Sequence, residues 1–226
     1  MQIFRYELIN GHVIAKHDGA LYLIDTGSPS SVAAETNFTF VGKNHIVQTD
    51  FLGVTVDSLS SHIGVKIDAL IGADLLKDFG MVIDPRTSEL KLFHGKLELC
   101  GMEMPVELFM GIPIIDASIN GRKIRIFFDT GAKLSYLNPE LTGDLTNIGY
   151  AEDFYPGLGQ FQTEIYSVSL KLGMEEIEMT VGNLPDLLQV SLMMAGTAGI
   201  LGTSILSSHV IGLDPGQQKL VLERID

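Results

Sequence analysis

The chain has 226 residues, 46% of them hydrophobic, and carries 28 acidic against 15 basic side chains. This length suits one large domain or two small lobes, with enough apolar residues for a sizeable core. The net charge of −13 argues against partners that are nucleic acids or anionic membrane surfaces. The single cysteine, Cys100, excludes a disulfide within the chain.

No segment approaches the roughly 18 uninterrupted apolar residues of a membrane-spanning helix. The first residues, "MQIFRYELING", lack the basic start and apolar core of a secretory signal. Together with the scarcity of cysteine, these features lead us to expect a cytoplasmic protein without a membrane partner.

Two hairpins are predicted in the chain, and each ends in Asp-Thr-Gly. Residues 11–27, "GHVIAKHDGALYLIDTG", indicate two strands joined at His17–Gly19. Residues 111–131, "GIPIIDASINGRKIRIFFDTG", indicate two strands joined by Asn120-Gly121, a strong signal for a tight hairpin turn. Helical periodicity is weak except in "ADLLKDF" at residues 73–79 and "LPDLLQVSLMM" at 184–194. The pattern predicts an all-β protein with a few short helices.

The sequence repeats itself once. Gly72 and Gly202 are 130 residues apart, as are Asp84-Pro85 and Asp214-Pro215, whereas the aspartates of the two Asp-Thr-Gly motifs are 104 residues apart. The second copy is therefore 26 residues longer between its aspartate and its glycine. We predict two lobes, residues 1–98 and 99–226, that diverged from one repeated unit.

Each copy supplies one aspartate on a tight turn at the end of a strand, Asp25 and Asp129. A two-fold relation between the copies would bring these carboxyl groups face to face, where both cannot ionise easily and they share a proton. One aspartate could then act as a general base on water while the other polarises a carbonyl group. This chemistry predicts hydrolysis of a peptide bond without a metal or cofactor.

The paired apolar-Asp-Thr-Gly motifs, followed by "ALIG" at 69–72 and "GILG" at 199–202, resemble the aspartic proteases. The size of each copy resembles the retroviral proteases (retropepsins), which are homodimers, and the chain looks like two such units fused in tandem. The resemblance covers nearly the whole chain. It implies the acid-protease fold: two β-barrel-like lobes about a pseudo-two-fold axis, with an inter-lobe sheet. It also implies an endopeptidase with a polypeptide substrate and a complete active site in one monomer.

The resemblance further implies roles for particular residues. Asp25 and Asp129 would form the catalytic dyad, and the residues that follow would support it: Thr26, Gly27, Ser28, Thr130, Gly131 and Ala132. The hydroxyl group of Ser28 could donate to a carboxylate, which Ala132 cannot do. The substrate would contact Leu70, Ile200 and a flap whose tip is "PGLGQF": Pro156, Gly157, Leu158, Gly159 and Phe161. The first copy lacks a glycine-rich tip, so we expect a single flap, from the second lobe.

The terminal and joining segments "QIFRYEL", "LKLFHGKLEL" and "KLVLERI" are predicted to build the inter-lobe sheet, at residues 2–8, 90–99 and 219–225. The six histidines show no spacing typical of a zinc site and are interpreted as surface or turn residues. Serine and cysteine nucleophiles are disfavoured because their motifs are absent. A glycosidase is disfavoured because the chain has no Trp to form a sugar platform. The remaining alternative is a catalytically idle, peptide-binding or scaffolding module on the same fold.

Overall fold

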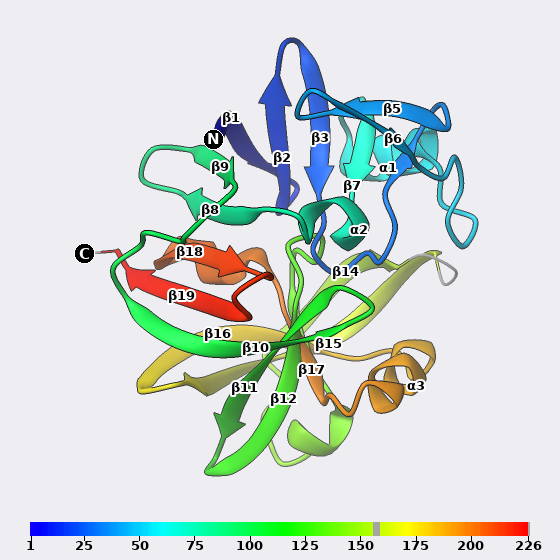
Figure 1. Ribbon diagram of the computed structural model, residues 1–226. Coiled ribbons are helices and arrows are strands. Elements are labelled where there is room, and N and C mark those ends of the chain that lie inside the picture. Colours follow the sequence, from blue (N-terminus) through cyan, green and yellow to red (C-terminus); the bar gives the residue numbers. More distant parts are fainter. Residues whose placement is uncertain (156–158, 226) are drawn as a thin grey trace.

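The structure is a computed structural model that describes residues 1–155 and 159–225. It is built mainly of strands, which confirms the predicted all-β class (Figure 1). The strands of the first half lie above those of the second in this view. None of the described helices is long and apolar enough to cross a membrane.

The first half contains nine strands and two helices. They are β1 (Gln2–Ile9), β2 (His12–His17), β3 (Ala20–Ile24), β4 (Val32–Ala33), β5 (Asn37–Phe40), β6 (Lys43–Ile46), α1 (Val56–Ile63), β7 (Ala69–Ile71), α2 (Ala73–Leu76), β8 (Gly80–Asp84) and β9 (Glu89–Phe93). The hairpin β2–β3 turns where it was predicted.

The second half repeats this order with longer strands in its middle. It contains β10 (Met102–Phe109), β11 (Ile112–Ile119), β12 (Arg122–Phe128), β13 (Ser135–Leu137), η1 (Pro139–Leu141), β14 (Gly149–Tyr155), β15 (Gly159–Leu172), β16 (Glu175–Asn183), α3 (Asp186–Met194), β17 (Gly199–Leu201), η2 (Thr203–Ser207), β18 (His209–Asp214) and β19 (Lys219–Arg224). The predicted hairpin β11–β12 turns at Asn120-Gly121, where both residues have positive φ angles of 50° and 77°.

Parallel pairing places both aspartates at the ends of buried strands. β3 pairs in parallel with β7, and β12 pairs in parallel with β17. The N–H of Asp25 then donates to the carbonyl oxygen of Ile71 (3.0 Å), and that of Asp129 to the carbonyl oxygen of Leu201 (2.9 Å). The same parallel pairing thus precedes the aspartate in each half, and both aspartates follow directly after a paired strand.

An antiparallel sheet joins the two halves. Its strands follow the order β1, β9, β8, β18, β19 and β10, and Figure 1 shows β8, β9, β18 and β19 together on the left of the view. The pair β8–β18 makes the connection between halves, with Ile83 opposite Ile211 and Met81 opposite Leu213. The predicted inter-lobe sheet is therefore present, and the segments at both chain ends belong to it.

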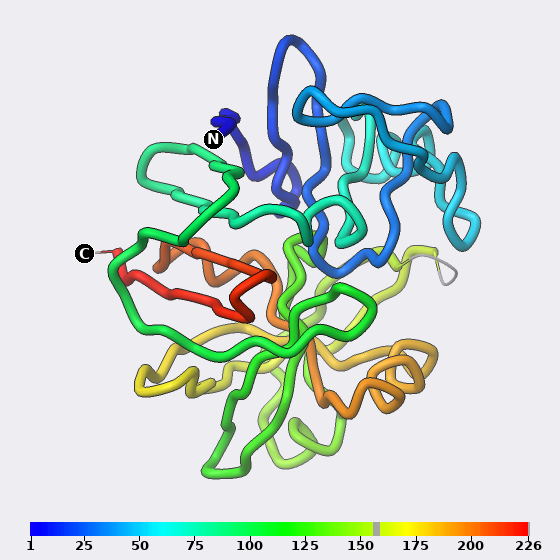
Figure 2. The backbone as a smooth tube through the Cα atoms, viewed as in Figure 1, coloured from blue at the N-terminus to red at the C-terminus, as the bar shows by residue number. Residues whose placement is uncertain are grey.

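The prediction for residues 90–99 is wrong in part, because the strand ends at Phe93. Residues 94–101 form no strand, and Figure 2 traces them along the outer edge of the molecule from β9 to β10. Leu97 is buried against Val82, Val210 and Val221 of the inter-lobe sheet. Its apolar side chain thus covers a face of the sheet and does not extend it.

Helix α1 was not predicted from its sequence. The helix begins after Thr55, whose hydroxyl group accepts from the N–H of Ser58 while the Ser58 hydroxyl accepts from the N–H of Thr55. It ends at Gly64, which is in the left-handed conformation. These capping signals are in the sequence, but the helix is only eight residues long and its periodicity is correspondingly short.

The two halves differ between β4 and β7 in the first and between β13 and β17 in the second. The first half has there only the small β5–β6 hairpin, which forms a separate two-stranded sheet, and α1. The second half has the long β14–β15 and β15–β16 hairpins and α3, so all 26 extra residues lie in this region. One large core connects the halves, from Phe4 and Ile83 to Ile126, Phe128 and Ile211.

We predict that Ile211→Ala lowers the free energy of unfolding of the whole chain. Ile211 is fully buried in the central pair of the inter-lobe sheet, and truncation of such a side chain costs about 2–5 kcal/mol. Urea unfolding should show one transition with a lower midpoint. Val190→Ala, on the exposed face of α3, is the control and should leave the midpoint nearly unchanged. Two separate unfolding transitions would contradict the conclusion that the two halves unfold together through the inter-lobe sheet.

Candidate active site

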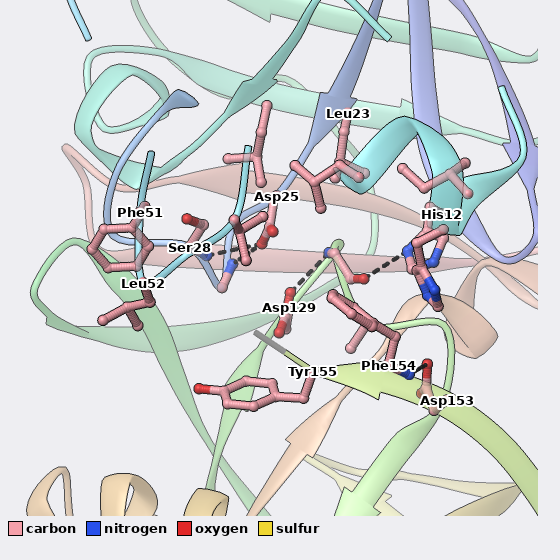
Figure 3. A pocket seen from close by; sticks show the side chains of 18 of the residues that line it. His12, Leu23, Asp25, Ser28, Phe51, Leu52, Asp129, Asp153, Phe154 and Tyr155 are labelled. Carbon is pink, nitrogen blue, oxygen red and sulfur yellow. Dashed lines mark hydrogen bonds between the residues drawn. The ribbon is translucent and has the colours of Figure 1, made fainter. Parts of the chain in front are cut away.

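The side chains of Asp25 and Asp129 meet at the base of a cavity between the two halves (Figure 3). Each carboxylate is held by its own turn. Oδ1 of Asp25 accepts from the N–H groups of Gly27 (3.0 Å) and Ser28 (2.8 Å), and Oδ1 of Asp129 accepts from the N–H of Gly131 (2.8 Å). The two carboxyl groups lie close enough for each to perturb the pKa of the other. The structure therefore brings together the two aspartates that the sequence singled out.

Each motif glycine lies against the carboxylate of the other half. A Cβ atom added to Gly27 would lie 2.1 Å from Cγ of Asp129, and one added to Gly131 would lie 2.4 Å from Cγ of Asp25. No side chain fits at either position. Glycine is required here because the backbone and a carboxylate approach so closely. The same approach occurs once in each half, at Gly27 and at Gly131.

Below the aspartates, Thr26 and Thr130 interlock the two turns. The hydroxyl of Thr26 donates to the carbonyl of Phe128 (2.8 Å) and accepts from the N–H of Thr130 (3.0 Å). The hydroxyl of Thr130 donates to the carbonyl of Ile24 (2.7 Å) and accepts from the N–H of Thr26 (3.1 Å). Both threonines are buried, so each hydroxyl satisfies one donor and one acceptor of the opposite half.

Burial shifts the titration of the pair. Removal from water raises the pKa of Asp25 well above its usual value, and the negative charge of Asp129 raises it further. Burial also raises the pKa of Asp129, although the N–H of Gly131 opposes this shift. The pair therefore keeps one proton up to a higher pH than two isolated carboxyl groups would.

The expected role of the Ser28 hydroxyl group is not what the structure shows. Its Oγ donates to the carbonyl of Ser30 (2.8 Å), while the backbone N–H of Ser28 reaches Asp25. The carbonyl groups of Ser28 and Ala132 have equivalent partners, since they accept from the N–H groups of Ala73 (2.8 Å) and Thr203 (2.9 Å). Ser28 and Ala132 thus support the turns through their backbones, which a difference in side chain does not alter.

The cavity has a volume of about 150 Å³ and a mainly apolar lining. The predicted residues Leu70, Ile200 and Phe161 line it, together with Gly27, Ser28, Gly131 and Ala132. On the first-half side its wall is formed by the turn at Phe51–Val54 and by α1, and on the second-half side by β14 and by Leu188 of α3. The β5–β6 hairpin does not line it.

The predicted flap falls partly outside the described residues. Pro156, Gly157 and Leu158 are not among them, whereas Gly159 begins β15 opposite Tyr155 and lies outside the cavity lining. The strands β14 and β15 form the expected hairpin on either side of this gap. Tyr155 lines the cavity, and burial and the nearby charges of Asp129 and Asp25 raise its pKa, so its hydroxyl group stays protonated.

Sequence reasoning missed a polar group at one end of the cavity. His12, His62 and Asp153 line it there, and Figure 3 shows His12 and Asp153 on the same side of the two aspartates. Asp153 is buried and accepts from the hydroxyl of Tyr136 (2.5 Å) and the N–H of Phe154 (2.8 Å). The interpretation of all six histidines as surface or turn residues is wrong for His12 and His209, which are buried. No local pattern marks either one.

Among the described residues, no group of three or more His, Cys, Asp or Glu side chains is arranged to hold a metal ion.

Comparison with solved structures found similar chains, one of which is described here. The chain is similar to the crystal structure of a retropepsin-like aspartic protease from Rickettsia conorii, at 21% sequence identity and a TM-score of 0.38. The alignment covers 54% of this chain and 88% of that one. No protein family model matches the chain, and no curated protein does. A likeness this distant carries no functional argument, which has to come from the site itself.

We predict that Thr26→Val destabilises the protein and Thr26→Ser does not. Valine has nearly the same shape but leaves the carbonyl of Phe128 and the N–H of Thr130 without their buried partner, at a cost of about 1–3 kcal/mol. Serine keeps the hydroxyl group. Urea unfolding of both variants measures the difference. Equal stabilities for the valine and serine variants would show that the hydrogen bonds of the Thr26 hydroxyl group contribute nothing to the free energy of unfolding.

Proposed function

We propose that this protein is an aspartic endopeptidase. A water molecule held between Asp25 and Asp129 loses a proton to the ionised carboxylate as its oxygen attacks the carbonyl carbon of a peptide bond. The protonated carboxyl group donates to the carbonyl oxygen, which becomes a hydroxyl in the tetrahedral intermediate. Transfer of a proton to the amine nitrogen then allows the C–N bond to break. Neither a covalent intermediate nor a cofactor is required.

The observation that carries this proposal is the contact between two carboxyl groups, from opposite halves, at the base of a cavity. Burial raises the pKa values of both acids, which costs stability unless a function uses them. A catalytically idle peptide-binding module has no need of such a pair. The apolar lining also suits a polypeptide in an extended conformation with apolar side chains at the cut.

We also propose that the halves, residues 1–98 and 99–226, are two retropepsin-type units fused in tandem. Matched hydrogen bonds support this relation. The N–H of Gly72 donates to Oγ of Ser31 (2.8 Å), and the N–H of Gly202 donates to Oγ of Ser135 (3.0 Å). On this proposal one monomer holds a complete site.

The role of the β14–β15 hairpin as a single flap remains part of the proposal. Phe161 and Tyr155 line the cavity from this hairpin, and the first half has a helix in the corresponding region. A closing hairpin would exclude water and supply backbone hydrogen bonds to a bound peptide. Binding would then depend more on the second half than on the first.

We predict that Asp25→Asn and Asp129→Asn each lower the rate at which a peptide library is cleaved by at least about a thousandfold. Each substitution removes one half of the acid–base pair. Both variants keep the shape of the side chain and should remain folded by circular dichroism. A chelator should leave the wild-type rate unchanged. A single variant with a near-normal rate would contradict the proposal, and peptide binding without cleavage by the wild type would favour the idle module.

The pH dependence of kcat/KM should be bell-shaped. Cleavage needs one proton on the pair, so the rate should fall at high pH as that proton is lost through the raised pKa, and at low pH as the second carboxylate is protonated. The descending limb should therefore lie at higher pH than the ordinary pKa of an aspartate. A rate that keeps rising into the alkaline range would contradict the shared proton.

We predict that Gly159→Val lowers turnover and that Gly42→Val does not. Both glycines have positive φ angles, 79° and 73°, in open surroundings at hairpin turns, so valine strains each turn alike. Only the turn that contains Gly159 belongs to a hairpin that lines the cavity. Initial rates are compared after confirming equal folded fractions. Equal effects of the two substitutions would show that the β14–β15 hairpin has no special role.

A further inference from the structure

Leu52 lies at the tip of a tight turn in the wall of the cavity. The turn closes with two hydrogen bonds of 3.0 Å between Phe51 and Val54, in which each N–H donates to the carbonyl oxygen of the other residue. Leu52 and Gly53 lie between them, with positive φ angles of 54° and 81°. The N–H of Gly53 also donates to Oδ1 of Asp50 (3.2 Å). Hydrogen bonds therefore fix the turn on both sides of its tip.

Leucine is an unfavourable residue for the first position of this turn. Both central residues need the left-handed conformation, which asparagine and glycine adopt readily and a bulky side chain adopts only at a cost. Asn10 and Asn120 hold the same position in the turns before β2 and β12. Leu52 therefore carries backbone strain that an asparagine in its place would relieve.

The side chain of Leu52 lies open at the edge of the cavity. Its exposed fraction is 63%, so a bound molecule can reach it. The rest of the turn is anchored, because Val54 is buried in the core beneath α1 and Phe51 packs against the same core. Figure 3 shows Phe51 and Leu52 on the side of the two aspartates away from His12 and Asp153. The tip thus holds an apolar side chain at the end of the cavity opposite the polar group.

Two other apolar residues of the described chain have a positive φ angle before a glycine, Val41 and Met110. Val41 packs against the main core, Met110 is 69% exposed, and neither lines the cavity. Among the described residues, Leu52 alone combines the strained conformation, an open apolar side chain and a place in the cavity wall. A polypeptide in the cavity would cover this side chain and remove apolar surface from water.

We propose that Leu52 is a specificity-determining residue, which packs against a large apolar side chain of a polypeptide bound in the cavity. The inference rests on the proposed function for the class of ligand but not for its cleavage. The contact forms on one side of the aspartates only, because His12 and Asp153 make the other side polar. Leu52 therefore selects an apolar residue at one position of the substrate, on one side of the cut.

The substitution Leu52→Asn separates this role from a purely structural one. Asparagine is favoured in the conformation of the turn and the leucine side chain is mostly exposed, so the midpoint of urea unfolding should rise slightly. The value of kcat/KM for a peptide with a large apolar side chain at the selected position should nevertheless fall about five- to thirtyfold, mainly through KM. A gain in stability with unchanged kcat/KM would overturn the inference.

The contact itself is tested by a cycle that pairs Leu52→Asn with changes in the peptide. Each apolar residue of a cleaved peptide is replaced in turn by alanine. In the wild type, alanine at one position should lower kcat/KM about five- to thirtyfold, whereas in Leu52→Asn the same replacement should cost less than about twofold. Equal sensitivity to alanine in both proteins, or no sensitive position in the wild type, would overturn the inference.

Met110→Asn is the matched control. Met110 has the same backbone conformation before a glycine and a similar exposed fraction, but lies outside the cavity lining. The substitution should raise the unfolding midpoint as Leu52→Asn does and leave the alanine sensitivity of the wild type intact. Loss of that sensitivity in Met110→Asn would overturn the assignment to Leu52. If Leu52→Asn does not fold, Leu52→Gly serves the same test, because glycine adopts the left-handed conformation without strain.

Peptide binding to the Asp129→Asn protein separates this inference from the proposed function. Peptides that bind but are never cleaved by the wild type would overturn the endopeptidase, while the same cycle on their dissociation constants would still decide the role of Leu52. A wild type that neither binds nor cleaves peptides overturns both.

Discussion

The structure of the site depends on the exchange of hydrogen bonds between Thr26 and Thr130. Each hydroxyl crosses to the other half, donates to the carbonyl that precedes the other aspartate, and accepts from the N–H of the other threonine. Neither turn can shift without leaving buried polar groups of both halves unpaired. The contact between the carboxyl groups, their raised pKa values and the need for glycine at Gly27 and Gly131 all follow from this close approach.

The inter-lobe sheet holds the two halves so that this approach is possible. β8 and β18 connect the halves in the middle, and the outer strands β1 and β10 continue into the hairpins that lead towards the aspartates. The hydrophobic core runs through the same junction, so the described residues of both halves share one core. A site that needs two carboxyl groups within hydrogen-bond reach benefits from a rigid frame, because a small shift between the halves would break the contact.

Around this symmetric centre, the walls of the cavity differ. Where the second half extends the β14–β15 hairpin, the first half has α1 and the turn at Phe51–Val54. The contact between the rings of His62 and Phe154 brings the two walls together at one end, where Asp153 and His12 make the lining polar. On the proposed function, a bound peptide would meet a different chemical environment at each end of the cavity, so its two directions of binding would not be equivalent.

The sequence by itself determined the strand-turn-strand units, the pair of Asp-Thr-Gly turns and the location of the 26-residue length difference. These features rest on local chemistry, such as Asn120-Gly121 in a two-residue turn, or on comparison of one half with the other. Tertiary structure alone decided the end of the strand at Phe93, the bond from the Ser28 hydroxyl to Ser30 and the burial of His12. The partner of His12 is Gly131, 119 residues away, and only the packing of one half against the other brings a histidine and a distant carbonyl together. The burial and the hydrogen-bond partner of such a side chain depend on long-range contacts, which leave no periodic trace in the sequence.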